Sequence, residues 1–191
     1  MSRSPDVPTP AVPAATQSSS PAVRIVPFDP ARPEHHAAFR DLNLAWIGAH
    51  FAVEARDRHE LDEPVGHILA AGGQIFMAEV DSGEILGTCA LLAEPDGAFE
   101  LAKMAVSETA RGRGVGRALG EAAIAAARAR GAPRVELLSS TVLAPAIALY
   151  RALGFVEVPL PPSDYARANI KMVLELSDRP SGAPTHAGPA R

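Results

Sequence analysis

Short apolar runs alternate with segments of helical spacing through residues 23 to 176, and the two patterns predict different elements. Runs rich in large apolar residues and bounded by turn-forming residues predict strands. They cover residues 23–28, 74–81, 84–94, 98–106, 134–141, 155–158 and 169–176. Helical spacing marks residues 33–51, the later part of 53–71, 116–130 and 146–153. The mixture predicts an α/β fold (mixed α+β) with a crossover helix between the fourth and fifth strands.

Glycine and proline indicate where several of these elements end. Ser82 and Gly83 separate the second and third strands and suit a tight hairpin. Gly131 and Pro133 supply a stop signal for the helix at 116–130. Pro145 stands where a first helical residue is expected, because a missing N–H costs nothing at that position.

Composition limits the folded unit to the middle of the chain. Residues 1–22 and 177–191 are rich in Pro, Ser, Ala and Gly and have too few large apolar side chains to offset the entropy of ordering them. We therefore expect two disordered tails around one domain at residues 23–176. A chain of 191 residues with 47% hydrophobic content suits a single domain.

Cysteine content and hydropathy favour a cytoplasmic protein without a membrane partner. Cys89 is the only cysteine, so no intrachain disulfide can form. No continuous apolar segment has the length of a signal peptide or membrane span. With no basic neighbour in "GTCALL", Cys89 is expected to be an unreactive thiol in a buried strand.

The segment "LAKMAVSETARGRGVGRALG", residues 101–120, places a glycine-rich turn between a strand and a helix. A helix N-terminus presents unpaired N–H groups and partial positive charge, so such a turn can bind an anion. The arginines at 111, 113 and 117 add positive charge. Residues 100–134 carry an excess of four positive charges in a chain whose net charge is −4. We therefore expect a phosphate group to bind at this turn, although the glycines could also form nothing more than a tight turn.

Two common nucleotide motifs do not fit this segment. A P-loop requires Gly-Lys-Ser/Thr, which "GVGRAL" lacks, and a dinucleotide fingerprint requires glycine where Arg117 stands. Nucleic-acid binding through "RGRG" also fits poorly, because the chain is acidic and no aromatic residues are interleaved there. We expect no nucleic-acid partner.

The pattern Arg111-x-x-Gly114-x-Gly116 after "MAV" resembles the pyrophosphate-binding signature of the GNAT superfamily of acyl-CoA-dependent N-acyltransferases. The segment "AIALYRALGF", residues 146–155, is similar to the fourth-helix motif of that family, which ends in Tyr-x-x-x-Gly-Phe. The order of elements over most of residues 23–176 matches as well. This resemblance implies a mostly antiparallel mixed sheet of about seven strands, splayed between the fourth and fifth and flanked by about four helices.

The resemblance implies acetyl-CoA as the co-substrate and no metal. In similar proteins a bulged strand bonds the pantetheine arm through its main chain, which maps to Met104, Ala105 and Val106. The pyrophosphate turn maps to Arg111, Gly112, Arg113, Gly114, Val115 and Gly116.

Two residues match catalytic positions of similar enzymes. Tyr150 matches the tyrosine that protonates the coenzyme A thiolate, although it also falls on an apolar helical stripe and could be a packed core residue. Glu100 coincides with a glutamate that acts as general base, the alternative being a surface carboxylate at a strand edge. Leu138 and Leu143 stand where many relatives carry Glu and Asn, so the identity of the base remains open.

Several polar residues carry weaker signals. The charged run at 54–63 predicts a solvated helix face, with an acidic lip of the acceptor cleft as the alternative. Asp164 and Tyr165 are second-rank candidates for acceptor contacts. The histidines show no metal-ligand spacing, so we expect them at the surface or in capping positions.

These observations favour an N-acetyltransferase that moves acetyl to a primary amine by direct attack in a ternary complex. The acceptor, a small-molecule or peptide amine, is not identified by the sequence. A non-catalytic acyl-CoA binding or sensing module is the alternative, because two family positions are occupied by leucine. A homodimer is compatible with the resemblance.

Overall fold

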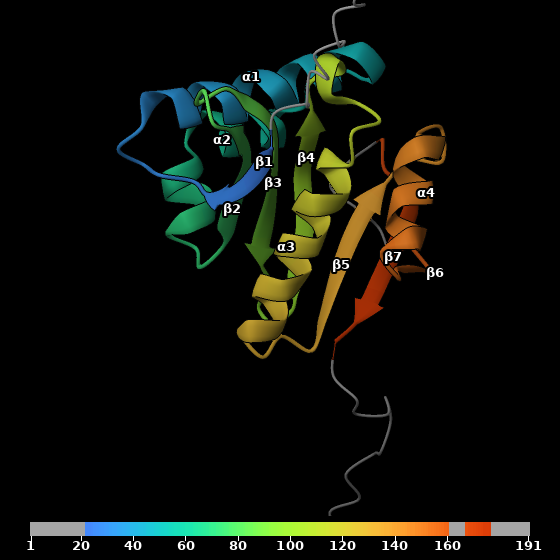
Figure 1. The fold of residues 1–191 in the computed structure, drawn as a ribbon. Coiled ribbons are helices and arrows are strands. Elements are labelled where there is room, and N and C mark those ends of the chain that lie inside the picture. The colour runs from blue at the N-terminus through green and yellow to red at the C-terminus, as the bar shows by residue number, and fades with distance from the viewer. Residues whose placement is uncertain (1–21, 161–166, 177–191) are drawn as a thin grey trace, which may run out of the picture.

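A seven-stranded sheet organises the part of the chain that the structure, a computed structural model, describes: residues 22–160 and 167–176 (Figure 1). The predicted tails, Ala22 apart, lie outside these residues, as do the acceptor-contact candidates Asp164 and Tyr165. Within the described ranges, no helix has the length and apolar character needed to cross a membrane.

The strand order confirms the predicted fold class. The strands are β1 (Val23–Pro27), β2 (Gln74–Val80), β3 (Ile85–Ala93), β4 (Phe99–Val106), β5 (Arg134–Ser139), β6 (Val156–Val158) and β7 (Ile170–Glu175). They lie in the order β1-β2-β3-β4-β5-β7-β6. Among the described strands, β4 and β5 form the one parallel pair and all other neighbours are antiparallel. The sheet is therefore mixed and mostly antiparallel, as expected.

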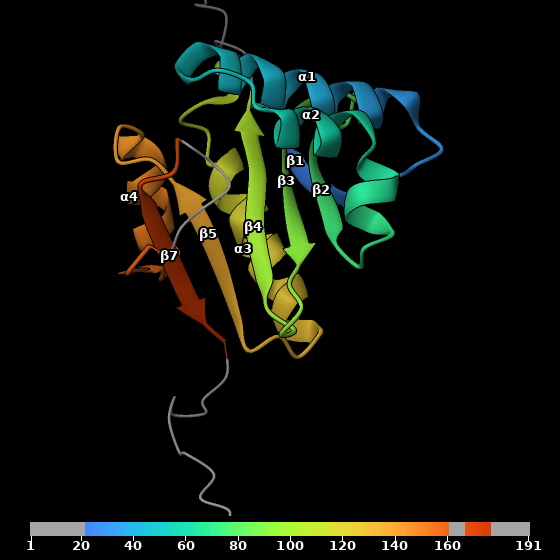
Figure 2. The same ribbon diagram turned by 180° about the vertical axis from the view of Figure 1, so that it is seen from behind.

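The helices cover both faces of the sheet. They are α1 (Pro33–His50), α2 (Ala55–Asp62), a π-helical turn η1 (Val65–Leu69), a short 3-10 turn η2 (Glu108–Ala110), α3 (Val115–Ala129) and α4 (Ala144–Ala152). The predicted segment 53–71 is divided into α2 and η1, because Pro64 between them cannot continue a helix. Helices α3 and α4 lie on one face (Figure 1), and α1 and α2 lie on the other (Figure 2).

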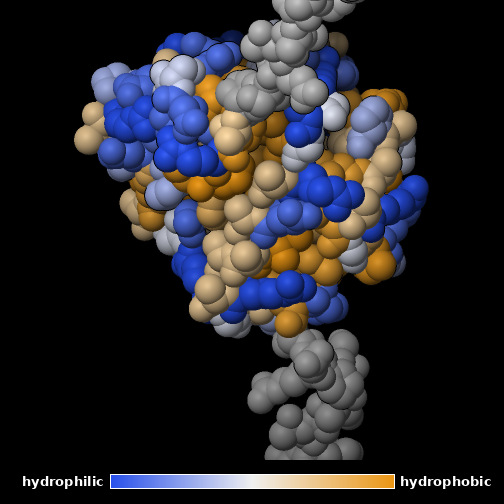
Figure 3. All heavy atoms as spheres, viewed as in Figure 1, coloured by the Kyte–Doolittle hydropathy of each residue, from blue (hydrophilic) through white to orange (hydrophobic). Residues whose placement is uncertain are grey.

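Each face of the sheet packs a separate core, and β2 shows how. Successive side chains of a strand point to opposite faces. Phe76 and Ala78 join the core beneath α3, while Ile75 and Met77 join the core beneath α1. Because both faces are covered, β2 is an apolar run that is buried along nearly its whole length. Figure 3, seen from the side of α3, shows hydrophobic surface beside that helix, interrupted by hydrophilic side chains.

The sheet separates between β4 and β5, as predicted. In the described structure these strands pair at Phe99–Val135 and Glu100–Glu136, although β4 continues to Val106. On its other edge, β4 pairs with β3 in a register that shifts by one residue between Thr88 and Ala90. The extra residue is accommodated by a bulge at Lys103 and Met104, and Lys103 has a φ of 50°. The bulge and the separation lie at the same level of β4.

Candidate active site

The bulge in β4 turns the Lys103 side chain toward α2. A bulge adds one residue to a strand, so two consecutive side chains can lie on one face of the sheet. Ala102 packs with the α1 core, and Lys103 reaches the same face, where its ammonium lies 3.0 Å from Asp57 Oδ1. Met104 returns to the α3 core. The Thr88 hydroxyl donates to the Lys103 carbonyl at 3.3 Å, which helps to hold the bulge in place.

The turn between β4 and α3 exposes main-chain N–H groups. Gly112 and Gly114 have φ angles of 75° and 81°, in the left-handed region that favours glycine. No described atom lies within 4 Å of where a Cβ would stand at either position, so this side of the turn is open. The Ala118 N–H bonds to the Gly114 carbonyl at 3.0 Å, so the preceding amides 115–117 have no acceptor within the described helix. Such a turn can bind an anion.

The other residues of the predicted signature divide between charge and packing. Arg111 and Arg113 are exposed beside the turn, and Arg111 lies 3.3 Å from Glu108. The Val115 side chain is buried in the core beneath α3. A Cβ at Gly116 would lie 3.3 Å from a leucine methyl of α4, so this glycine permits close packing of the two helices. Coenzyme binding by this turn stays a prediction.

A cavity of about 90 Å³ opens where β4 and β5 separate. Its wall includes Asn43 and Trp46 of α1, Glu100 and Met104 of β4, Ser140 and Tyr150. The structure thus brings together both predicted catalytic residues and one of the three predicted pantetheine contacts. In the described structure Ala105, Val106 and the glycine turn do not contribute to this wall.

Tyr150 of α4 lies in a position that is compatible with both alternatives left open by the sequence, a packed core residue and a proton donor. Its ring packs edge-on to Phe155, with ring centroids 6.1 Å apart, at the margin of the core. The residue is half-buried and lines the cavity. Its hydroxyl forms no hydrogen bond with the residues that the structure describes. Burial raises the pKa of Tyr150 to about 12, so the phenol keeps its proton at neutral pH. These properties suit a proton donor, and that role stays a prediction.

Glu100 is not a surface carboxylate. It is 7% exposed and lines the cavity from β4. Burial raises its pKa above the usual range, although the Arg56 guanidinium, 3.4 Å from Glu100 Oε2, opposes the shift. A buried carboxylate with a raised pKa binds a proton more readily than an exposed one, which suits a general base. The alternative of an exposed strand-edge residue is therefore wrong, and the role of base remains a prediction.

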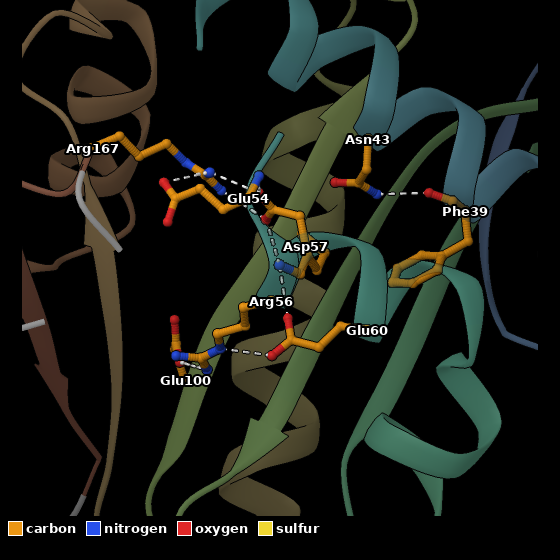
Figure 4. Close-up of polar contacts among 9 residues, drawn as sticks. Phe39, Asn43, Glu54, Arg56, Asp57, Glu60, Glu100 and Arg167 are labelled. Atoms are coloured by element: carbon orange, nitrogen blue, oxygen red, sulfur yellow. Dashed lines mark hydrogen bonds and ion pairs between the residues drawn. The ribbon is translucent and has the colours of Figure 1, made fainter. Parts of the chain in front are cut away.

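Asp57 of α2 is the centre of a buried ion-pair cluster beside the cavity (Figure 4). The carboxylate is fully buried and accepts hydrogen bonds from both terminal nitrogens of Arg167, at 2.7 and 2.8 Å. The Lys103 ammonium donates at 3.0 Å. Burial alone would raise the pKa of Asp57, but the Arg167 hydrogen bonds and the Lys103 charge outweigh it and lower the pKa to about 2.

The cluster extends along α2 to Glu100. Glu60 lies 2.7 Å from the Lys103 ammonium and 2.8 Å from Arg56 Nε, and Arg56 then reaches Glu100 (Figure 4). The prediction of a solvated helix face at residues 54–63 is therefore wrong for two of its carboxylates, because the β4 bulge supplies a lysine that draws them inward. The alternative, an acidic surface near the acceptor cleft, agrees better with the position of Asp57 in the cavity wall.

Two further expectations have different outcomes. Cys89 lies buried in β3, and burial raises the pKa of its thiol, as expected of an unreactive cysteine. His35 is buried, contrary to the expectation of surface histidines. Its Nδ1 accepts a hydrogen bond from the Asp29 N–H at 2.9 Å, and its ring lies tilted against Phe28, which together hold the turn into α1. No group of three or more potential metal ligands occurs among the described residues.

The sequence pattern does not predict Asn43, Lys103, Ser140 or Arg167 as residues of this site. Lys103 did carry a signal, because a lone lysine interrupts the otherwise apolar end of "FELAKMAV". A buried lysine requires a carboxylate partner, which the charged run at 54–63 supplies. The other three carry no local signal, because only the folded chain brings them to one wall.

Comparison with known proteins connects this geometry to a family. Residues 71–157 match the family model described as an acetyltransferase (GNAT) domain. No curated protein matches the sequence.

Solved structures share the fold over most of the described chain. An acetyltransferase of the GNAT family from Staphylococcus aureus Mu50 has a TM-score of 0.73 at 20% identity, over 82% of this chain and 100% of that chain. An acetyltransferase from Streptococcus agalactiae 2603 has a TM-score of 0.69 at 24% identity, over 81% and 98%. An acetyltransferase of Bacillus subtilis in complex with CoA has a TM-score of 0.61 at 20% identity, over 82% and 100%.

Proposed function

Because residues 71–157 match the model of an acetyltransferase (GNAT) domain and the fold is shared with a GNAT-family acetyltransferase, we propose that this protein transfers acetyl from acetyl-CoA to a primary amine by direct attack in a ternary complex. One observation carries the proposal. The bulge in β4 and the separation of β4 from β5 meet at a cavity lined by Glu100 and Tyr150. A residue that can accept a proton and one that can donate it therefore face the same space.

Coenzyme binding is supported by main-chain features on either side of β4. The bulge and the splay leave strand groups near Met104 and Val106 available to a pantetheine arm. The open turn around Gly112 and Gly114 offers N–H groups for the pyrophosphate, with Arg111 and Arg113 beside it. The shared fold with a Bacillus subtilis acetyltransferase solved with CoA adds support.

The transfer requires two proton movements. The amine nitrogen forms a bond to the thioester carbonyl carbon, and the carbon–sulfur bond breaks. Tyr150 gives its proton to the departing thiolate, which leaves as the thiol of CoA. Glu100 takes the proton that the nitrogen loses, directly or through a water molecule. The raised pKa of Glu100 suits this task, since a higher pKa makes the carboxylate a stronger base.

Direct attack is favoured over a covalent acyl-enzyme. A thiol nucleophile needs a lowered pKa and access to the substrate. Cys89, the only cysteine, is buried beneath α3, where its thiol lies 3.6 Å from the Leu119 carbonyl, and burial raises its pKa.

A non-catalytic acyl-CoA binding module is the second candidate. Leu138 and Leu143 both line the cavity where many relatives carry Glu and Asn, so part of the family's polar machinery is replaced by apolar side chains. Such a module needs the glycine turn but not the proton path through Glu100 and Tyr150.

Turnover separates the two candidates. The full chain is incubated with acetyl-CoA and a panel of primary amines that includes monoamines, polyamines, amino acids, aminoglycosides and lysine peptides. Thiol release is followed continuously, and the products are identified by mass. We expect an N-acetylated product from at least one class, at a rate well above acetyl-CoA hydrolysis. Saturable acetyl-CoA binding without any acetylated product would support the binding module.

A further inference from the structure

We propose, on the premise of acyl transfer in this cavity, that the acceptor is a primary monoamine with an apolar body, whose nitrogen is held by Asn43 and Ser140. Both side chains line the cavity, and both are more than nine-tenths buried. Each has a polar atom without a hydrogen-bond partner among the described residues.

The orientation of Asn43 is fixed by its donors. The residue is 2% exposed, and its Nδ2 donates to the Phe39 carbonyl at 2.8 Å and to Thr88 Oγ1 at 3.1 Å. A carbonyl can only accept, so the nitrogen must face Phe39. Figure 4 shows the other branch of the amide, Oδ1, turned away from Phe39. Oδ1 accepts no hydrogen bond from the residues that the structure describes, so it can receive an N–H donor of a ligand.

Ser140 offers a second group across the splay. The residue is 5% exposed and follows directly after β5. Its carbonyl accepts from the Leu143 N–H at 3.0 Å, whereas its hydroxyl has no partner in the described part of the chain. Ser140 lies beyond the paired residues Glu100 and Glu136, on the part of the chain where β5 has separated from β4, and it lines the same cavity as Met104. Asn43 lines this cavity from α1 and is joined to β4 through Thr88, which bonds the Lys103 carbonyl.

The charges beside the cavity favour a cation. Ion pairs link three cations, Arg56, Lys103 and Arg167, to four carboxylates, which are Glu54, Asp57, Glu60 and Glu100. Among these described residues the carboxylates outnumber the cations by one. Two of these carboxylates, Asp57 and Glu100, line the cavity, so the net negative charge of the cluster lies beside it. An ammonium group complements this charge.

The rest of the wall favours an apolar body without a second charge. Trp46, Ile47 and Phe51 line it from the C-terminal end of α1, and Leu143 lines it beside α4. The rings of Trp46 and Phe51 lie 6.2 Å apart. Burying a second ammonium or a carboxylate against these apolar side chains would cost free energy, because the charged residues of the wall, Asp57, Glu100, Lys103 and Arg167, are already held in ion pairs. Polyamines, amino acids and sugars are therefore expected to be poor acceptors.

Two matched pairs of amines test the substrate class. Hexylamine and 1,6-diaminohexane differ in one terminal amino group, and phenethylamine and phenylalanine differ in one carboxylate. We expect kcat/KM to be higher for the monoamine by about tenfold or more in each pair. A diamine or amino acid acetylated as well as its partner would overturn the proposal while leaving acyl transfer intact. No product from any amine of the wider panel would instead refute the proposed function.

Two substitutions test the nitrogen site. Ser140→Ala removes only a hydroxyl and should raise the KM for hexylamine by about threefold to tenfold, with the KM for acetyl-CoA unchanged. Asn43→Leu should do the same, and if it fails to fold the serine variant still decides. Ser82→Ala, in the exposed β2–β3 turn, is the matched control. An unchanged hexylamine KM in Ser140→Ala would overturn the assignment of Ser140.

Discussion

The coenzyme end and the acceptor end of the proposed site are built from different parts of the chain. The coenzyme end comes from one continuous stretch, residues 103–117, and depends on main-chain conformation: the bulge at Lys103 and the positive φ angles of Gly112 and Gly114. The acceptor end is made of side chains from widely separated parts of the chain, and Asn43 and Arg167 are more than a hundred residues apart. The coenzyme end therefore depends on contacts that are local in the sequence, and the acceptor end depends on long-range contacts.

Solved structures that have about a fifth of their residues in common with this chain share its fold. A main-chain site needs only glycine at a few positions and tolerates change elsewhere. A side-chain site changes with every substitution in its wall. We therefore expect variants at the coenzyme end to alter acetyl-CoA binding alone and variants at the acceptor end to alter amine selection or stability.

The largest effect is expected at Tyr150, where the two ends meet. Tyr150→Phe keeps the ring packed against Phe155 but removes the proton donor, so kcat should fall by about 10² to 10⁴. The affinity for acetyl-CoA, measured by calorimetry, should stay close to that of the wild type. Full activity in this variant would assign Tyr150 to packing alone.

A smaller effect, on stability, is expected at the acceptor end. Asp57→Asn removes the buried carboxylate that Lys103 and Arg167 share, while Lys103 keeps its ion pair with Glu60 and Arg167 keeps its ion pair with Glu54. Breaking the buried pairs to Asp57 costs about 3 to 5 kcal/mol. The melting temperature should fall by about 6 to 20 °C. Asp62→Asn, on the exposed side of α2, is the control and should melt like the wild type.

The pH dependence of this contribution has a definite sign. The pKa of Asp57 is lowered from 3.8 in the unfolded chain to about 2 in the folded one, so its stabilisation is present above about pH 4 and is lost as the pH falls toward 2. The stability difference between wild type and Asp57→Asn should therefore shrink over that range. A constant difference down to pH 2 would contradict the assigned role of the carboxylate.

The smallest change in stability is expected at Glu100. Replacing this residue with glutamine should lower the turnover but raise the stability. The folded pKa of Glu100 is raised, so ionisation above the unfolded value of 4.5 disfavours folding. Glu100→Gln should raise the melting temperature at pH 7 by about 1 to 3 °C. Turnover should fall most on the acidic side of the pH profile, where the amine arrives protonated. A lower melting temperature or a flat pH response would show that Glu100 is not a strained base.

The sequence predicts the coenzyme end and most of the fold for the same physical reason. Both signals are local in the sequence. The periods of strands and helices depend on residues that are close in the chain, and Arg111, Gly114 and Gly116 lie within six positions. Even so, the spacing does not reveal that Gly116 serves helix packing while Gly112 and Gly114 supply the open turn.

Apart from Glu100 and the alternative of an acidic lip at residues 54–63, the acceptor end could not be predicted, because its contacts depend on tertiary structure. The run at 54–63 has the composition of an exposed helix, and only the one-residue bulge at Lys103 draws Asp57 and Glu60 inward. Asn43 and Ser140 have no local pattern that marks them, since each becomes a cavity residue only when α1 and β5 pack around β4.

Calorimetric titration of acetyl-CoA tests most directly whether main-chain groups of the glycine turn hold the coenzyme. Gly114→Asp is compared with Gly97→Asp, in the turn before β4, where the glycine has a similar φ of 84° and no described atom within 4 Å of a Cβ. Both variants carry the same new charge and the same backbone strain. The affinity for acetyl-CoA should fall by about tenfold or more in Gly114→Asp and be unchanged in Gly97→Asp. Equal affinities in the two folded variants would contradict coenzyme binding by the glycine turn.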